Sequence, residues 1–267
     1  MRLRALLPFS AALLCAAAPS GDPLRQAIDA PGRDPTQVAR DATRHPYEVL
    51  HFLGVKPTSS VVEIWPGRRG YWTPILANYL AHGIYYVALG QTDGSGVERA
   101  FASPPAELAG DPGSRQAPYT NVKLTQFSAA HPMPAPANSA DFVLTFRNLH
   151  NWMSGGDAAQ LLAGIHRSLK PGGILGIEDH RAAPDQPQDP KAKDGYVRQD
   201  YAIQLVEKAG FKLVSASEIE RNPRDTTHWP KGVWTLPPSY ALGDTDRAKY
   251  QAIGEADNFL LKFRKVG

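Results

Sequence analysis

The chain has 267 residues, of which 42% are hydrophobic, so it is long and apolar enough to form the core of one α/β domain. Its formal charge of +3 gives no argument for nucleic-acid binding, because residues 1–20 supply two of the arginines and no acid. The single cysteine, Cys15, excludes an intramolecular disulfide bond.

The N-terminal residues 1–20 have the pattern of a bacterial secretory signal peptide. Arg2 and Arg4 precede a short apolar run, and the small residues that follow fit cleavage after Ser20. No later apolar stretch approaches the length of a membrane-spanning helix. We therefore expect a periplasmic or secreted protein without a stable membrane anchor after cleavage, in which 21–267 form a single domain.

Strand and helix patterns alternate along most of that domain. Apolar runs closed by turn residues predict seven strands, at 60–65, 84–89, 121–127, 141–146, 173–179, 212–219 and 258–266. Amphipathic segments and capping residues predict two short helices within 34–54 and further helices at 71–83, 94–103, 157–171 and 195–210. The alternation predicts a mostly parallel sheet with helices on both faces.

Two segments lie outside this alternation. Residues 21–34 are rich in proline, glycine and aspartate, and we expect them to be irregular. The segment 222–257 is too long to be structureless in a compact domain and contains two tryptophans. We expect it to form a cap over the sheet.

The stretch VVEIWPGRRGYWT, residues 61–73, reads as a strand, a glycine turn and a helix. Ligands of open parallel sheets bind beyond the carboxyl ends of the strands, where the backbone must approach them closely. Gly67 and Gly70 suit that turn, whereas Trp65 and two arginines stand where small residues are usual. A tight turn that binds no ligand remains the alternative.

Further segments before and after this turn stand in a recognisable order. They are RDATRHPYEVLHFLGVKP, DFVLTFRNLHNW, LKPGGILGIEDHRA, GYVRQDYAIQLVEKAGFKLV, NPRDTT and NFLLKFRKV. With the glycine turn, they resemble class I S-adenosylmethionine-dependent methyltransferases, and more closely a bacterial group of exported, predicted methyltransferases. The resemblance implies a Rossmann-like, seven-stranded, mostly parallel sheet with an antiparallel last strand, and S-adenosylmethionine as the cofactor.

The resemblance also implies where the cofactor binds. Glu63 matches the acid of the first-strand motif, and Gly67 matches one of its glycines. The full set expected at the cofactor is Glu63, Gly67, Gly70, Asp93, Gln126, Phe127 and Asn148. The chain departs from the family at the end of the second strand, where Leu89 and Gly90 replace the acid that normally binds the ribose hydroxyls. Asp93 lies three or four residues too late for that position.

Candidate catalytic groups follow the fourth and fifth predicted strands. RNLHNW places His150 at the ligand edge of the sheet, and EDHRA places Asp179 and His180 beside it. A histidine paired with a carboxylate is a suitable general base near neutral pH, and methyl transfer needs a positioned nucleophile. Either histidine can instead serve only as a structural hydrogen-bonding group. Their spacing matches no known metal-ligand signature, so no metal is expected.

Four further residues are candidates for substrate binding. Arg147 and Arg181 suit a carboxylate or phosphate, Trp152 suits an aromatic wall, and Tyr196 suits the closure of the site from above. The sequence therefore predicts a methyltransferase that acts on a small molecule and binds no nucleic acid. The alternative is a catalytically inactive, methyltransferase-like protein that binds another ligand in the periplasm.

Overall fold

The computed structural model describes residues 21–67, 70–90 and 122–267. The expected signal peptide, the expected helix 94–103, the two arginines of the glycine turn and Asp93 all lie outside the described residues. Within the described ranges, no helix combines the length and apolar character needed to cross a bilayer.

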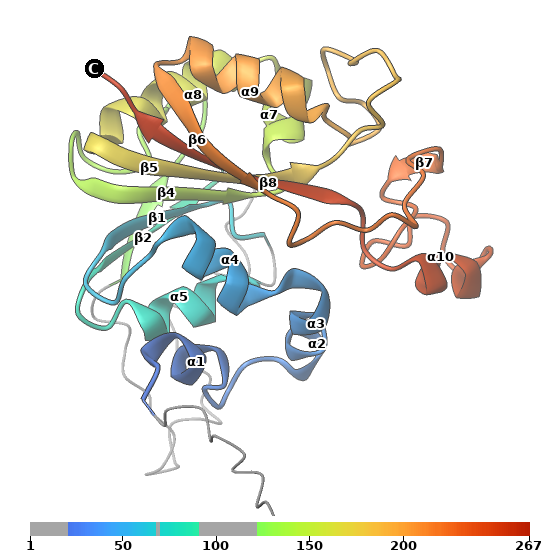
Figure 1. The fold of residues 1–267 in the computed structure, drawn as a ribbon, viewed down its shortest axis with the longest axis horizontal. Helices are drawn as coiled ribbons and strands as arrows, with labels where there is room; N and C mark the ends of the chain where they lie inside the picture. The colour runs from blue at the N-terminus through green and yellow to red at the C-terminus, as the bar shows by residue number, and fades with distance from the viewer. Residues whose placement is uncertain (1–20, 68–69, 91–121) are drawn as a thin grey trace, which may run out of the picture.

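A seven-stranded sheet forms the centre of the molecule and confirms the expected fold class (Figure 1). Its strands are β1 (Ser60–Ile64), β2 (Ile84–Leu89), β3 (Val122–Gln126), β4 (Ala140–Phe146), β5 (Leu169–His180), β6 (Phe211–Ser217) and β8 (Asn258–Lys265). The strand order is β3-β2-β1-β4-β5-β8-β6. The first five strands pair in parallel, and β8 runs antiparallel to both β5 and β6. The order reverses between β1 and β4, so a ligand crevice is expected at their carboxyl ends.

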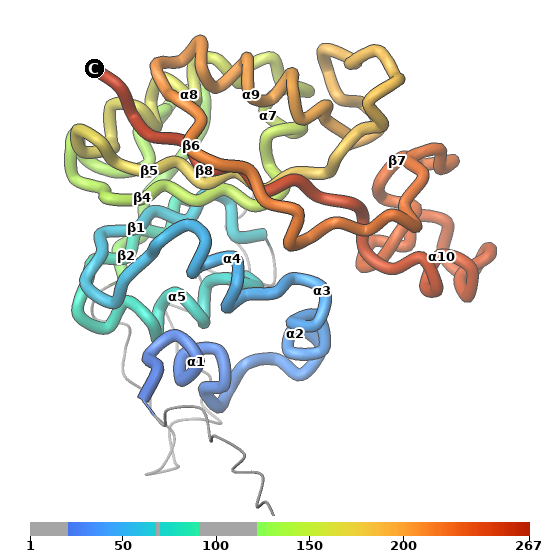
Figure 2. Tube along the Cα trace, viewed as in Figure 1, coloured from blue at the N-terminus to red at the C-terminus, as the bar shows by residue number. Residues whose placement is uncertain are grey.

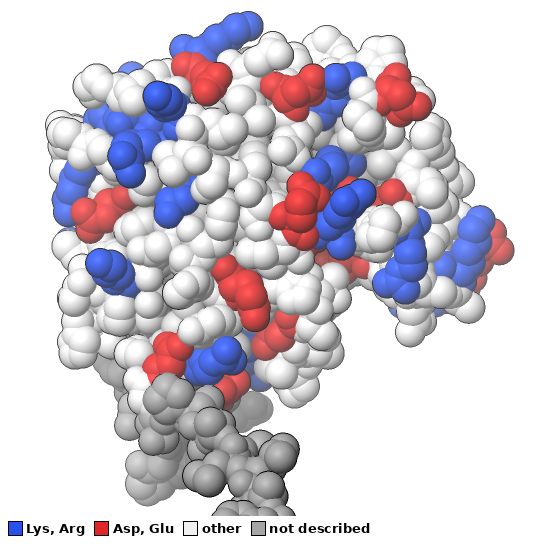
Figure 3. Space-filling view, in the orientation of Figure 1, with Lys and Arg blue, Asp and Glu red and all other residues white. Residues whose placement is uncertain are grey.

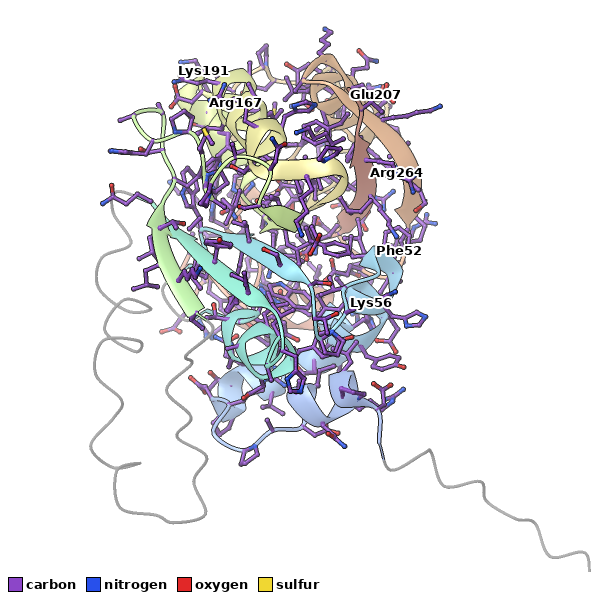
Figure 4. All side chains as sticks on the ribbon, turned by 90° about the vertical axis from the view of Figure 1, so that its left-hand side faces the viewer. Phe52, Lys56, Arg167, Lys191, Glu207 and Arg264 are labelled. Carbon is purple, nitrogen blue, oxygen red and sulfur yellow. The ribbon has the colours of Figure 1, made fainter. Side chains whose placement is uncertain are left out.

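Helices cover both faces of the sheet. The helices α1 (Pro23–Ile28), α4 (Pro46–Leu53) and α5 (Thr73–Tyr79) lie on one face, and α7 (Leu149–Gly155), α8 (Ala158–Ser168) and α9 (Gln199–Lys208) lie on the other (Figures 1 and 2). Figure 4 shows Arg167 and Glu207 in the upper layer and Phe52 in the lower one. The short helix α7 was not expected from the sequence.

Burial explains why the central strands read as continuous apolar runs. All five residues of β1 are buried, because a helical layer packs against each face of this strand. One apolar cluster joins the sheet to α7, α8 and α9, and a second joins it to α1, α4 and α5. The sheet is thereby held rigidly, and the ends of its strands can position side chains with precision.

The N-terminal segment is more helical than the sequence indicated. Residues 23–28 form α1, whose first turn is capped by the Asp22 carboxylate, so the expectation of an irregular 21–34 was wrong in this part. Between Asp34 and Gly54 there are three helices rather than two: α2 (Pro35–Val38), α3 (Asp41–Arg44) and α4. His45 has a left-handed backbone, with φ of 42°, and separates α3 from α4.

The segment 222–257 contains the short strand β7 (Pro230–Val233) and helix α10 (Arg247–Ile253). These elements project beyond the carboxyl ends of the parallel strands (Figure 1). A separate apolar cluster of Val233, Leu236, Tyr250 and Ala256 packs against Tyr196 and stabilises this segment. The outline in Figure 3 is notched between the segment and the N-terminal helices, and acidic and basic side chains are interspersed on the face shown.

Candidate functional site

A cavity of about 750 Å³ lies at the carboxyl ends of β1, β4 and β5. Four parts of the chain surround it: the glycine turn after β1, the strand ends, the N-terminal helices and the segment 222–257. The residues used below that line it are Arg40, Arg44, Glu63, Trp65, Gly67, Gly70, Trp72, Phe146, Arg147, Asn148, His150, His180 and Trp234. The cavity therefore occupies the place where the strand order reverses, as the sequence predicted.

The turn after β1 presents its backbone to this cavity. Gly67 and Gly70 have φ of 73° and 53°, a region in which L-residues with a side chain are strained. A Cβ added at Gly67 would meet no atom within 4 Å, so open space lies beside the backbone there. Such a turn allows a ligand to approach the main chain closely, as expected of a cofactor loop.

Glu63 lies at the wall of the cavity near this turn. Its carboxylate is 1% exposed and accepts hydrogen bonds from the Thr73 hydroxyl, at 2.8 Å, and from the Tyr85 hydroxyl. Burial raises the pKa of Glu63 to about 7, against the two hydrogen bonds that lower it. The first-strand acid is thus poised between its two protonation states near neutral pH.

Trp65 fills space between the glycine turn and the third strand. Its backbone is left-handed, with φ of 45°, and its indole N–H donates to the carbonyl oxygen of Phe127 at 2.9 Å. Its ring meets those of Phe127 and Trp152 edge-on, with centroids 6.1 Å away in each case. Phe127 and Trp152 are buried beneath it and do not line the cavity, while Gln126 is exposed at the end of β3.

The two candidate catalytic histidines face the same cavity. The Asp179 carboxylate accepts from the backbone N–H of His150 at 2.8 Å and lies 2.7 Å from the Nδ1 of that ring. The rings of His150 and His180 are 5.3 Å apart between centroids, and Trp234 lies edge-on to His150 at 6.0 Å. The sequence therefore placed His150, Asp179 and His180 together correctly.

The second histidine is oriented by a residue that the sequence did not indicate. The Nδ1 of His180 lies 2.8 Å from the Oδ1 of Asn258, on the neighbouring strand β8. Burial lowers the pKa of His180 to about 3, although Asp179 opposes that shift. His180 is therefore neutral at physiological pH and, with Nδ1–H donating to Asn258, presents an unprotonated Nε2.

The spacing of His150, Asp179 and His180 would also admit a metal ion, because each offers a ligand atom within 4.8 Å of the others. Both oxygens of Asp179 are already engaged, however. They accept from the backbone and ring of His150 and from the backbone N–H of His180. A metal bound by this carboxylate would have to displace those hydrogen bonds, so the arrangement fits proton transfer better.

Arg147 and Asn148 extend from the end of β4 into the site. Arg147 has a left-handed backbone, with φ of 63°, and its side chain pairs with Glu255 at 2.9 Å and with Glu178 at 3.3 Å. The amide of Asn148 donates to the carbonyl oxygen of Ile64 at 3.0 Å, which ties the ends of β4 and β1 together. Trp65 and Arg147 thus have left-handed backbones just after two neighbouring strands, β1 and β4. Strained residues of this kind are typical of a functional site.

Two arginines of the N-terminal segment belong to the site and were not among the sequence candidates. Arg40 binds the Glu255 carboxylate through Nε at 2.6 Å and Nη2 at 2.9 Å. Arg44 lies 3.3 Å from the same carboxylate, with its guanidinium 4.5 Å above the centre of the Tyr71 ring. Partners more than 200 residues apart in the chain leave no local signal that could have identified them.

Behind Arg147, two glutamates form a fully buried pair. Burial raises the pKa of Glu220 well above its usual range, and the charge of Glu178 raises it further. Burial also raises the pKa of Glu178, against the charge of Arg147, whose Nε lies 3.3 Å from the Glu178 carboxylate. Two carboxyls thus lie behind Arg147, and of the two Glu178 pairs with it directly.

The other two substrate candidates lie away from the cavity. Arg181 pairs with Glu218 at 3.0 Å and lines a different hollow, of about 740 Å³, between α9 and the segment 222–257. The Tyr196 hydroxyl donates to the Asp225 carboxylate at 3.0 Å, and the Tyr196 ring packs edge-on against His180. The structure gives both residues packing and ion-pair contacts, and their expected contact with substrate stays a prediction.

The residues present fit the amino-acid end of S-adenosylmethionine. An open glycine turn and a buried acid face the cavity. The position at which a ribose acid is expected is occupied by Leu89, a buried aliphatic residue at the end of β2. The residues that follow it, 91–121, lie outside the described part of the chain.

Comparisons with known proteins bear on the fold and on the reaction class. A model of the methyltransferase domain family matches residues 100–177. No curated protein matches the chain in sequence.

Solved structures show the same fold at low sequence identity. A SAM-dependent methyltransferase from Aquifex aeolicus shares 18% identity over 88% of this chain and 95% of its own, with a TM-score of 0.56. A putative sarcosine dimethylglycine methyltransferase from Galdieria sulphuraria shares 13% identity over 86% of each chain, with a TM-score of 0.55. The cyclase SpnF shares 17% identity over 85% of this chain and 82% of its own, with a TM-score of 0.54. The chain therefore has the Rossmann-like fold of the S-adenosylmethionine-dependent methyltransferases, and the domain match supports S-adenosylmethionine as its cofactor.

Proposed function

We propose that this protein transfers a methyl group from S-adenosylmethionine to a small molecule bound in the cavity at the ends of β1, β4 and β5. One observation carries the proposal: an imidazole oriented by a buried carboxylate faces the same cavity as an open glycine turn. The fold and the methyltransferase domain match support the reaction class. The fold alone does not, because SpnF is a cyclase.

The residues of the glycine turn would hold the cofactor. The left-handed backbone at Gly67 and Gly70 leaves room for close main-chain contacts, and Glu63 supplies a buried acceptor beside them. Bound S-adenosylmethionine supplies an electrophilic methyl group. Asn148 keeps the ends of β1 and β4 in register, which fixes the cofactor side of the cavity relative to the histidine side.

His150 would accept the proton that the methyl acceptor loses. With Asp179 accepting from its Nδ1–H, the neutral ring has its lone pair on Nε2, and this atom makes no hydrogen bond with the described residues. The charge that the ring gains is stabilised by the Asp179 carboxylate, so a hydroxyl or amine acceptor becomes a better nucleophile. His180 stays neutral and lies beside this ring as a second polar contact.

Calorimetric titration of the protein with S-adenosylmethionine and with S-adenosylhomocysteine tests the proposal. We expect saturable binding of both ligands by the wild-type protein and none by Gly67→Trp, because the indole would occupy the space beside the turn. The absence of binding to the wild-type protein at millimolar ligand would overturn the proposal.

We also propose that residues 1–20 direct export and that the protein acts in the periplasm or outside the cell. The charged start, short apolar run and small residues of this segment support the assignment. Cell fractionation of a tagged chain, with mass spectrometry of its N-terminus, tests it. A cytoplasmic protein that retains residue 1 would contradict it.

A second function, ligand binding without catalysis, is favoured by two observations. Trp65 packs over Phe127 and Trp152 between the first and third strands, and Leu89 stands where an acid normally binds ribose. In that case the cavity binds a different small molecule. Unmeasurable affinity for both S-adenosyl compounds, together with saturable binding of another metabolite, would favour this second function.

A further inference from the structure

Three guanidinium groups converge on one carboxylate at the N-terminal side of the cavity. The Oε2 atom of Glu255 lies 2.9 Å from Arg40 Nη2, 3.3 Å from Arg44 Nη2 and 2.9 Å from Arg147 Nη1. The three arginines line the cavity, whereas Glu255 stands behind them. Glu255 therefore holds the cationic groups in place and leaves their other edges toward the cavity.

The donors that remain free are on two of these arginines. Arg40 uses all three nitrogens, on Glu255 and on the Gln37 side chain. Arg44 Nη1 and Arg147 Nη2 make no hydrogen bond with the described residues, and neither is among the buried polar atoms that lack a partner. Both atoms are therefore accessible, on side chains that line the cavity.

The charges near these arginines do not balance locally. Three guanidinium groups, those of Arg40, Arg44 and Arg147, pair directly with two carboxylates, those of Glu255 and Glu178. The cationic groups therefore outnumber their direct carboxylate partners. At the ends of β4 and β5, Asp179 carries a negative charge beside two histidines, of which at least His180 is neutral. A buried, unbalanced cation is costly unless an anion pairs with it.

We propose that Arg44 and Arg147 bind a carboxylate of the methyl acceptor, which makes the substrate a small organic acid. This inference rests on the proposed methyl transfer and names its substrate class. Such a molecule would place its acid toward the arginines and its nucleophile toward His150.

Apolar side chains of the cavity lining suit a flat, apolar molecular body. Trp72 stacks on Phe146 with centroids 4.3 Å apart, and Trp234 and two prolines also line the cavity. Aromatic faces and a fixed pair of guanidinium donors are the contacts that an aromatic carboxylate uses. We therefore choose benzoate as the probe of this subsite and benzyl alcohol as its neutral counterpart.

The first measurement compares the two probes on the wild-type protein by calorimetry, in the presence of EDTA and a saturating concentration of S-adenosylhomocysteine. We expect benzoate to bind about tenfold or more tightly than benzyl alcohol, because charge-assisted hydrogen bonds replace a neutral hydroxyl. Equal affinities, or no benzoate binding, would overturn the inference without any variant being made.

The second measurement uses Arg44→Met, with Arg264→Met as a control that removes the same charge from an exposed position on β8 (Figure 4). We expect Arg44→Met to bind benzoate about tenfold or more weakly and benzyl alcohol unchanged, and the control to change neither. Circular dichroism checks that both variants are folded. An unchanged benzoate affinity in folded Arg44→Met would contradict the role of this arginine.

A carboxylate at the arginines can also come from the cofactor itself, and a third measurement separates the two sources. S-adenosylhomocysteine has an amino-acid carboxylate, whereas 5′-methylthioadenosine has none. The arginines serve the cofactor, and the inference fails, if two results are found together. Arg44→Met weakens the binding of S-adenosylhomocysteine but not of 5′-methylthioadenosine, and benzoate and S-adenosylhomocysteine exclude each other. Simultaneous binding of both ligands supports the acceptor. If the wild-type protein binds neither S-adenosylmethionine nor S-adenosylhomocysteine, the proposed methyl transfer itself is refuted.

Discussion

The turn after β1 and the ends of β4 and β5 face one cavity but are built by different means. At the turn, the glycines at positions 67 and 70 leave backbone exposed beside empty space. At the other strand ends, every polar group of Asp179 is engaged and both histidine rings are fixed by a partner. The first region is defined by main-chain conformation and the second by side-chain hydrogen bonds. We therefore expect substitutions in the two regions to affect different steps.

The largest effect is expected at the hydrogen-bonded region. His150→Ala removes the proposed proton acceptor, so we expect the rate of methyl transfer to fall by about 10²–10⁴-fold while cofactor affinity stays within a factor of about two. Turnover assays with an acceptor found by the binding experiments, together with calorimetry, measure both quantities. An equal loss of cofactor affinity would remove the distinction between the two regions.

Asp179→Asn tests the same proton transfer through the carboxylate partner of His150. The amide keeps the volume of the side chain but no longer stabilises a protonated His150 ring, so we expect a similarly large loss of rate. A rate close to that of the wild type, in a folded variant, would show that Asp179 has only a structural role.

The buried acid beside the turn, Glu63, is tested by its effect on folding stability rather than on the reaction rate. Its folded pKa of about 7 lies above the ordinary value of 4.5, so between these values the folded state binds a proton that the unfolded chain has released. The stability of the wild-type protein should therefore fall by about 3 kcal/mol as the pH rises from 4.5 to 7. Glu63→Gln cannot titrate and should lack that decline.

Urea unfolding of both proteins at a series of pH values measures this difference. At pH values more than about one unit above the folded pKa of about 7, the contribution of Glu63 should be constant, because the carboxyl is then ionised in both states. Parallel stability profiles for the wild type and Glu63→Gln would show that folding does not raise the pKa of this carboxyl.

A smaller effect is expected from the glycine turn itself. Gly67 and Gly172 share φ of 73°, and a Cβ added at either one meets no atom within 4 Å. Alanine should therefore cost about 1–2 kcal/mol of folding stability at both positions. Only Gly67→Ala should also weaken cofactor binding, by about tenfold, since only Gly67 lines the cavity. Calorimetry on both variants tests this, and equal affinities would indicate that the turn does not contact the cofactor.

The smallest effect is expected at Trp65, which joins the glycine turn to the third strand. Trp65→Phe keeps an aromatic ring but removes the indole N–H that donates to the Phe127 carbonyl. We expect about 1 kcal/mol lower stability. If Trp65 also blocks the cofactor, Trp65→Gly should bind S-adenosylmethionine more tightly than the wild type. Denaturation and calorimetry distinguish these outcomes.

The regular part of the molecule was predictable because its signals are local. A buried strand appears as an apolar run, as in β1 and β2, and the carboxyl ends of parallel strands share one edge of the sheet. That rule is sufficient to predict that His150, Asp179 and His180 lie together. The capped helix α1 was missed because its short, proline-initiated turn lies in a segment with the composition of a loop.

Sequence by itself therefore determined the fold class, the glycine turn after β1 and the histidine–aspartate group. The tertiary structure alone decided what faces those groups across the cavity. Glu255 joins Arg40, Arg44 and Arg147, and Asn258 orients His180, through contacts between residues far apart in the chain. The tertiary structure also placed Arg181 in a separate hollow. The physical reason is that backbone periodicity is set by near neighbours, whereas charge pairing depends on how distant segments pack.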